Sequence, residues 1–317
     1  MPVQSPTSQP RSLIARHPVA VFFALTYVIS WTGALVVAVP YLLRNQAVPK
    51  MAGLFMFPAM LLGPCLVGIA LTWATGGRGG LKDLLFRMGR TRLSVRWYAT
   101  LFIPPAVVMA VLFGLQTFVS PVFAPNTFFV GASFGFIAGF FEEIGWMGYA
   151  FPRMNPQHSV LGSGVLLGLL WGVWHLPVVD YLGTATPHGS YWLPYFMAFI
   201  AVMTAMRVLI GWTYSNTKSV ALAQLTHASS TGSLVVLSPA GVTAKQEALW
   251  YAVYAVALWI VVALVVLKAS RTRVDRMSHC GAPRVLRSRD LNADAPLADS
   301  NAHLCHQGLY EHMMLTS

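Results

Sequence analysis

Two adjacent glutamates, Glu142 and Glu143, lie in one of the most apolar parts of this chain, the segment FGFIAGFFEEIGWMGYAFPRM. A charged carboxylate at the centre of a bilayer costs roughly 3 kcal/mol on insertion scales, and a second carboxylate beside it opposes joint ionisation. Acidic residues inside membrane segments are rare and mark functional sites by default. We therefore interpret the pair as water-activating carboxylates; the alternative is a structural pair that fixes helix packing through hydrogen bonds.

Two histidines occupy other apolar segments. His175 lies in LLWGVWHLPVV, with Trp171 four residues earlier on the same helical face, and His227 lies in SVALAQLTHASSTGSL, with Thr231 one turn later. Each histidine alone is more typical of a packing residue in a helical core. Two acids and two histidines on three segments cost less when they converge, so together they predict a single site.

Two chemistries suit this set of residues. In one, histidine and glutamate hold a divalent metal that makes a bound water nucleophilic. In the other, a glutamate–histidine pair is the general base, and histidine and hydroxyl donors stabilise an oxyanion. The spacing does not favour a metal, because there is no H-E-x-x-H and only the glutamates share a segment. We expect no cofactor, with zinc as the alternative.

The composition requires lipid as the solvent. Hydrophobic residues make up 56% of the 317 residues and charged residues only 10%, whereas a soluble domain is about one quarter charged. We predict an all-α, polytopic membrane protein with a transmembrane domain at 18–268, between a tail at 1–17 and a flexible tail at 269–317. Eight apolar segments are long enough to cross a bilayer, at about 18–43, 51–75, 98–119, 128–150, 159–180, 191–212, 218–237 and 246–268.

The charge distribution predicts the topology. The net charge is +11, and these spans place most Lys and Arg on one side of the membrane, while the loops 120–127 and 181–190 have none. The positive-inside rule then puts both termini in the cytoplasm, where basic residues meet anionic lipid. The basic segment 76–98 has the spacing of an amphipathic helix and begins at a glycine-rich turn. No basic folded domain suggests a nucleic-acid partner, and no targeting segment is visible, so we expect a bacterial inner membrane.

Three motifs resemble a known family. The segment EEIGWMGYAFPRM is similar to the first motif of the CPBP intramembrane endopeptidases, which include CAAX prenyl proteases and bacteriocin-processing and immunity proteins (the Abi domain). WGVWHLP resembles the second motif and NTKSVALAQLTHASST the third. The motifs occur in the family's order, and the resemblance covers about residues 130–235.

This resemblance implies a glutamate protease with an eight-helix fold and no catalytic metal. It implies that Glu142 activates water with His175, that Glu143 orients Glu142, and that His227 and Thr231 support the oxyanion. The family's third motif usually ends in Asn where this chain has Thr231.

The larger departure from the family concerns an arginine. The first motif reads E-E-x-x-x-R, and its arginine position here is Met147. Arg153 and Arg207 are the candidates to replace the missing cation. Because the motif cation is missing, Glu143 is the carboxylate that we most expect to be protonated.

The leading functional hypothesis is an endopeptidase that cleaves a membrane-associated peptide, such as a prenylated CAAX protein or a leader peptide. The altered motif leaves open a catalytically degenerate scaffold or immunity protein. A transporter with a buried proton relay is a third class, but it predicts inverted repeats, and none is visible.

Overall fold

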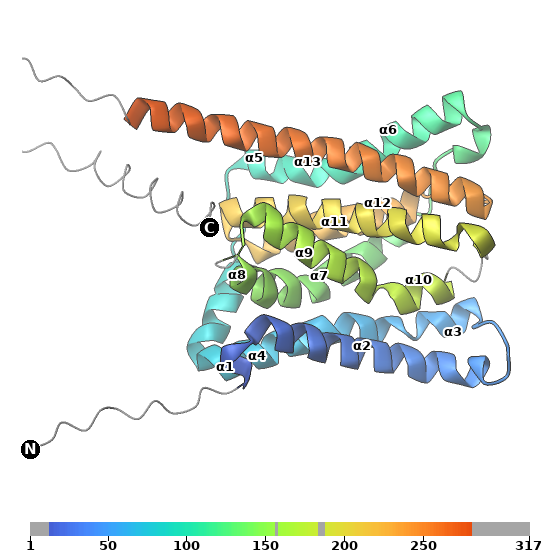
Figure 1. Cartoon of the computed structure of the whole chain (residues 1–317), viewed down its shortest axis with the longest axis horizontal. Helices are drawn as coiled ribbons and strands as arrows, with labels where there is room; N and C mark the ends of the chain where they lie inside the picture. Colours follow the sequence, from blue (N-terminus) through green and yellow to red (C-terminus); the bar gives the residue numbers. More distant parts are fainter. Residues whose placement is uncertain (1–12, 156–157, 183–187, 281–317) are drawn as a thin grey trace, which may run out of the picture.

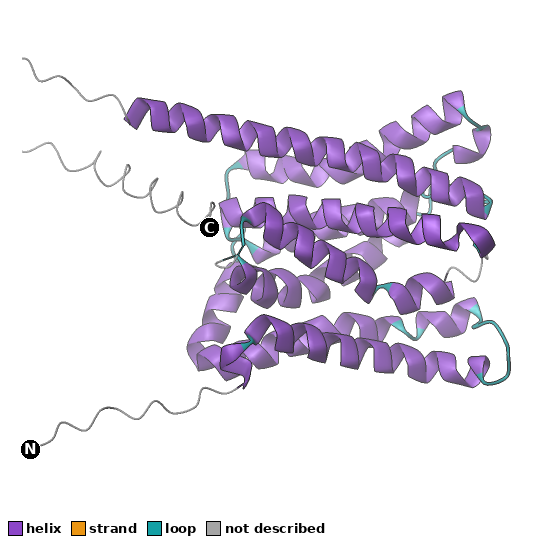
Figure 2. Cartoon of the chain, viewed as in Figure 1, coloured by secondary structure: helices purple, strands orange, loops and turns teal. Residues whose placement is uncertain are grey.

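The computed structural model describes residues 13–155, 158–182 and 188–280. These residues form helices without any strand (Figure 2), which confirms the predicted all-α fold. A helix overlaps each of the eight predicted segments: α2 Pro18–Leu42, α4 Phe57–Met88, α6 Ile103–Phe118, α7 Gly131–Gly145, α9 Val160–Trp174, α11 Trp192–Thr217, α12 Val220–Leu237 and α13 Ala244–Cys280. Short helices connect them: α1 Leu13–Arg16, α3 Lys50–Leu54, α5 Val95–Tyr98, α8 Phe151–Met154 and α10 Leu176–Leu182.

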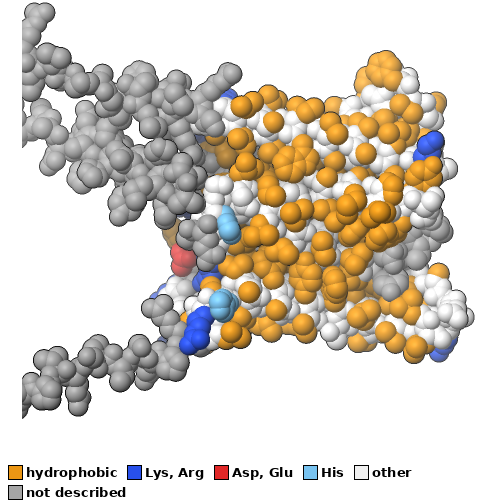
Figure 3. Space-filling view, viewed as in Figure 1, with side chains coloured by type: hydrophobic (Ala, Val, Ile, Leu, Met, Phe, Trp, Pro, Cys, Tyr) orange, Lys and Arg blue, Asp and Glu red, His pale blue; other side chains and the backbone are white. Residues whose placement is uncertain are grey.

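The helices form a bundle with a membrane protein's surface. Six helical spans among the described residues are long and apolar enough to cross a bilayer: Pro18–Leu42, Met51–Met88, Val95–Phe118, Gly189–Thr217, Val220–Leu237 and Ala244–Ala269. Large apolar side chains such as Val36, Phe113 and Leu264 are more than 60% exposed. Hydrophobic side chains cover the middle of the face in Figure 3, as lipid contact requires.

The two helices in the middle of the sequence are shorter than predicted. Helices α7 and α9 have 15 residues each, or about 22 Å at 1.5 Å per residue, against a hydrocarbon core of about 30 Å. Helix α7 continues directly into a π-helix, η3 (Trp146–Ala150), and then into α8. Helix α9 ends just before His175, and α10 follows.

The first described helix and the end of α13 lie at the same end of the bundle (Figure 1), as an even number of crossings requires. Helix α13 extends past residue 268, the predicted end of the membrane domain, to Cys280. The rest of the predicted C-terminal tail, 281–317, and residues 1–12 of the predicted N-terminal tail lie outside the described residues.

The predicted glycine-rich turn is a kink within α4. Gly77 has φ 54° and ψ −146°, a conformation that favours glycine. After the kink, Leu84 is buried in a cluster with Cys65 and Ile144. Arg87 donates hydrogen bonds to the carbonyl of Gly148 (3.0 Å) and to other elements, so the basic segment is folded against the bundle.

Glycines spaced four residues apart hold α7 against α12. Gly131, Gly135 and Gly139 face α12, and a Cβ added at Gly139 would lie 2.5 Å from the backbone oxygen of Gln224. Gln224 also donates from Nε2 to the carbonyl of Phe140 at 2.8 Å. Small residues of this kind let membrane helices approach closely, where packing and hydrogen bonds drive association.

A second set of glycines does the same for α9 and α11. These are Gly164, Gly168 and Gly172, and a Cβ at Gly168 would lie 2.5 Å from the Cα of Thr204. The two close helix pairs, α7–α12 and α9–α11, carry most residues of the site described next; His175 directly follows α9, and Trp146 begins η3.

Candidate active site

The glycine contacts between α7 and α12 bring Glu143 and His227 together. The Nδ1 atom of His227 lies 2.7 Å from Oε1 of Glu143, and both side chains are at most 1% exposed. Glu143 follows Gly139 by one turn, so a close helix contact and the hydrogen bond lie next to each other. The predicted convergence of these two segments is therefore present.

Helix α11 supplies a cation to the same carboxylate. Nη1 of Arg207 lies 2.6 Å from Oε1 of Glu143, and neither side chain is exposed to solvent. Of the two candidate replacements for the motif arginine, Arg207 is the one that contacts Glu143. A guanidinium this close favours the ionised carboxylate, so the expectation that Glu143 is protonated is wrong. Met147 is fully buried, and Arg153 lies elsewhere, where it donates to the carbonyl of Tyr149.

Glu142 has a different environment from its neighbour. Its Oε2 accepts hydrogen bonds from the indole nitrogens of Trp171 (2.8 Å) and Trp146 (3.1 Å). Glu142 is 3% exposed and has no ion pair among the described residues. The two glutamates are therefore unequal: Glu143 is bound by a guanidinium and an imidazole, and Glu142 by two neutral donors.

Trp171 contacts four other residues of the site. Its ring centroid lies 5.0 Å from that of His175 and 5.1 Å from that of His227, both edge to face. The guanidinium of Arg207 lies over the same ring, 3.9 Å from its centroid. The indole thus joins both histidines, the arginine and Glu142 in one buried cluster.

His175 is held in one tautomer by its own helix. Its Nδ1 lies 2.7 Å from the carbonyl oxygen of Trp171, and a carbonyl only accepts, so Nδ1 donates. In the neutral ring Nε2 then carries the lone pair. Trp174 and Phe199 flank the ring at 4.8 and 5.5 Å. Within the described residues no hydrogen bond joins His175 to Glu142; the two meet through the Trp171 side chain.

Thr231 lies one turn after His227 on α12 and is partly buried. In the part of the chain that the structure describes, its hydroxyl makes no hydrogen bond to the glutamates or the histidines. Its predicted role as an oxyanion donor is thus a prediction that only a reaction can test.

The backbone changes its hydrogen-bonding pattern directly after the glutamates. Residues Trp146–Ala150 form a π-helix, an element that frequently occurs at functional sites. All five of its residues are buried. Hydropathy did not reveal this turn, and it did not identify Trp146 as a hydrogen-bond donor to Glu142. The four-residue spacing of Trp146 and Glu142 could have indicated that contact.

The donor geometry bears on the metal alternative. No three His, Cys, Asp or Glu side chains among the described residues are grouped as metal ligands would be. Oε1 of Glu143 already faces Nη1 of Arg207 and Nδ1 of His227. The expectation that no cofactor is needed, with zinc as the alternative, stays a prediction.

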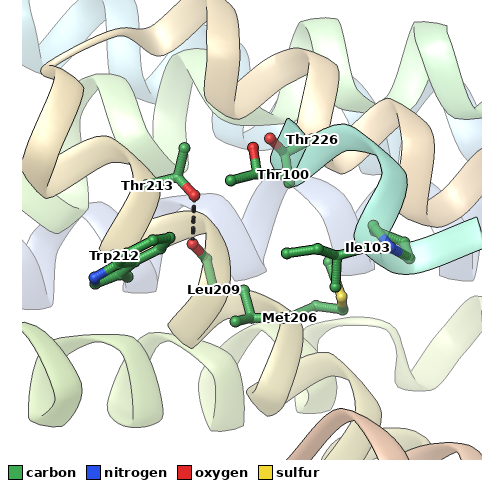
Figure 4. A pocket seen from close by; sticks show the side chains of 8 residues that line it. Thr100, Ile103, Met206, Leu209, Trp212, Thr213 and Thr226 are labelled. Atoms are coloured by element: carbon green, nitrogen blue, oxygen red, sulfur yellow. Dashed lines mark hydrogen bonds between the residues drawn. The ribbon is translucent and has the colours of Figure 1, made fainter. Parts of the chain in front are cut away.

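A separate small cavity of about 10 Å³ lies near the site but contains none of its residues (Figure 4). Three threonines line it, and each hydroxyl bonds a backbone carbonyl: Thr100 to Trp97, Thr213 to Leu209 and Thr226 to Leu222. At about one water in size, and with its hydroxyls satisfied, this cavity cannot admit a peptide.

Comparison with known proteins shows which family this part of the chain resembles. Residues 124–232 match the family described as type II CAAX prenyl endopeptidase Rce1-like. That range contains all five predicted site residues and Arg207. Over 221 aligned residues the chain is 26% identical to a Methanococcus maripaludis protein named CAAX prenyl protease 2. The alignment covers 65% of this chain and 78% of that protein.

Proposed function

We infer that this chain is a member of the Rce1-like family of CAAX prenyl endopeptidases, a family of proteases. We propose that it hydrolyses a peptide bond of a membrane-associated substrate with water activated by Glu142 and His175. The observation that carries the proposal is the buried cluster around Trp171. Four membrane helices contribute to that cluster, and its polar side chains are too costly to bury without a function.

Glu142 is the better general base of the two carboxylates. Its neighbour is already bound by Arg207 and His227, whereas Glu142 accepts only two indole hydrogens. In the proposed reaction, Glu142 removes a proton from water as the water oxygen attacks the scissile carbonyl carbon. The proton then passes to the leaving nitrogen as the C–N bond breaks.

His175 is proposed to receive or share that proton at Nε2. Its Nδ1 hydrogen is fixed on the carbonyl of Trp171, so Nε2 is the nitrogen available to a water molecule. The fixed ring orientation supports this role in the way that a second hydrogen bond orients a catalytic histidine.

The predicted role of His227 depends on the protonation of its ring. If Glu143 is the carboxylate partner of Arg207, Nδ1 of His227 donates to it, and Nε2 of the neutral ring has no hydrogen. Oxyanion stabilisation by Nε2 therefore requires the imidazolium. With both glutamates ionised, Arg207 and an imidazolium at His227 would bring the net charge of the cluster to zero. Thr231 is the proposed second donor, from its hydroxyl.

We further propose that no metal takes part, that both termini are cytoplasmic, and that the substrate is a prenylated CAAX protein or a leader peptide in a bacterial inner membrane. The scaffold alternative loses its motivation, because Arg207 supplies the cation whose absence suggested it.

The test is cleavage of a fluorogenic peptide in which a farnesylated cysteine is followed by three C-terminal residues. The same peptide without the lipid is measured alongside. Glu142→Gln keeps the size of the side chain and removes the base, so we expect a loss of about 100-fold or more. Glu247→Gln is the matched control, since that glutamate bonds His188 on another part of the bundle. The mechanism is wrong if Glu142→Gln cleaves as fast as the parent protein.

A further inference from the structure

The cation of the glutamate pair comes from an unexpected helix. Arg207 is 64 residues from Glu143 in sequence, yet its Nη1 lies 2.6 Å from Oε1 of that residue. Arg207 is fully buried, as is the uncharged Met147, which stands where the motif has its arginine. The arginine side chain thus makes the charge contact that Met147 cannot.

Burial makes this contact consequential. A buried ion pair that loses one partner leaves an uncompensated charge, which destabilises strongly. Oε1 of Glu143 also accepts from Nδ1 of His227, so one oxygen is shared by the guanidinium and the imidazole. Arg207 therefore fixes the rotamer of Glu143 and, through it, the ring of His227.

Arg207 also acts on the other glutamate. Its guanidinium lies 3.9 Å from the centroid of Trp171, a cation–π distance, and the same indole donates to Glu142 at 2.8 Å. A cation over the face of the ring draws electron density from it, which makes the indole N–H a better donor. One side chain from α11 thus connects to both carboxylates, directly to one and through an indole to the other.

We propose that Arg207 is the positioning residue that supplies the cation of the catalytic glutamate pair, from α11 in place of the motif position on η3. This inference rests on the proposed function for the roles of the glutamates. It goes beyond that function because it assigns a task to a residue outside the three motifs, and because it explains how this chain tolerates Met147.

The test is an exchange of the cation between the two positions. Arg207→Met should lower kcat by about 100-fold or more, the size typical of a lost preorganised donor, with KM little changed. Arg207→Lys keeps the charge but not the planar stacking on Trp171, so its loss should be smaller. Met147→Arg added to Arg207→Met should raise kcat at least tenfold above that of Arg207→Met alone, because the positive charge returns.

Arg153→Met is the matched control. Arg153 also lies over an aromatic ring, at 3.8 Å from the centroid of Tyr149, but it has no contact with the glutamates. We expect Met147→Arg to give no recovery in that background. A general effect of added positive charge would raise both backgrounds alike and overturn the assignment.

The thermal midpoint of each purified variant is a second readout that needs no activity. It should fall in Arg207→Met and rise again in the exchanged protein. If the double variant with Arg207→Met and Met147→Arg is neither faster nor more stable than Arg207→Met alone, Arg207 does not have the role that we assign to it. Glu142→Gln is measured alongside to test the proposed reaction itself. If no variant cleaves the peptide, the thermal midpoints still show whether Arg207 has the positioning role.

Discussion

Gly139 sets the distance between the two helices that carry Glu143 and His227. A Cβ at this position would lie 2.5 Å from the backbone oxygen of Gln224 and 2.8 Å from the backbone nitrogen of Ala228. Non-bonded heavy atoms rest at about 3.5–4.0 Å, so Gly139→Ala has to move α7 and α12 apart by roughly 1 Å. Backbone atoms cannot turn aside as a side chain can.

The same movement acts on the site one turn away. If α7 moves as a rigid unit, the His227–Glu143 distance of 2.7 Å grows beyond the limit of about 3.2 Å for a good hydrogen bond. Overpacking costs about 1–3 kcal/mol and a lost hydrogen bond to a charged group about 1.5–3 kcal/mol, while alanine returns about 1 kcal/mol of helix propensity. The expected loss in free energy of unfolding is thus about 1.5–5 kcal/mol.

The assay is the thermal midpoint of purified Gly139→Ala, with peptide cleavage measured below that midpoint. Gly114→Ala on α6 is the matched control, because nothing lies within 4 Å of its added Cβ. The control should be as stable as the parent or more so, since alanine favours the helix. A Gly139→Ala protein with the parent's midpoint and cleavage rate would refute the close-contact argument.

Three further substitutions test other parts of the site. Trp171→Phe removes the donor to Glu142 and should slow cleavage about 10–100-fold, measured as kcat. Thr231→Val should slow it about tenfold or more with an unchanged thermal midpoint, because the hydroxyl is proposed to act only on the reacting carbonyl; an unchanged rate would remove Thr231 from the mechanism. Arg87→Gln should lower the midpoint, at a cost of about 1 kcal/mol for the bond to Gly148, while kcat stays near the parent's.

Hydropathy and motif spacing predicted the helices and the converging residues, but not the ends of the helices that carry them. Composition records how apolar a segment is, and it does not record where the backbone hydrogen-bonding pattern changes. The predicted segment 128–150 therefore contains both α7 and a π-helix, and 159–180 contains α9 and most of α10.

The sequence offered two arginines as the cation that contacts Glu143, but it did not show which of the two makes the contact. Which one reaches the carboxylate depends on how closely α9 and α11 pack, and Gly168 sets that distance. The signal was present as glycines at intervals of four on both short helices. Read as close-packing positions, they would have placed α11, and with it Arg207, next to the helix of Trp171.

The π-helix at Trp146–Ala150 affects how the motif should be counted along the chain. A π turn bonds residue i to i+5 and so accommodates one residue more than an α turn. Because each residue rotates an α-helix by about 100°, side chains after the turn lie on a different face from the one that their sequence numbers suggest. Residue-by-residue comparison with a relative that lacks the extra residue would therefore pair side chains on different faces of α8. Removal of one residue from the turn should restore α-helical register and turn Arg153 away from Thr75, to which its Nη2 now donates at 3.1 Å.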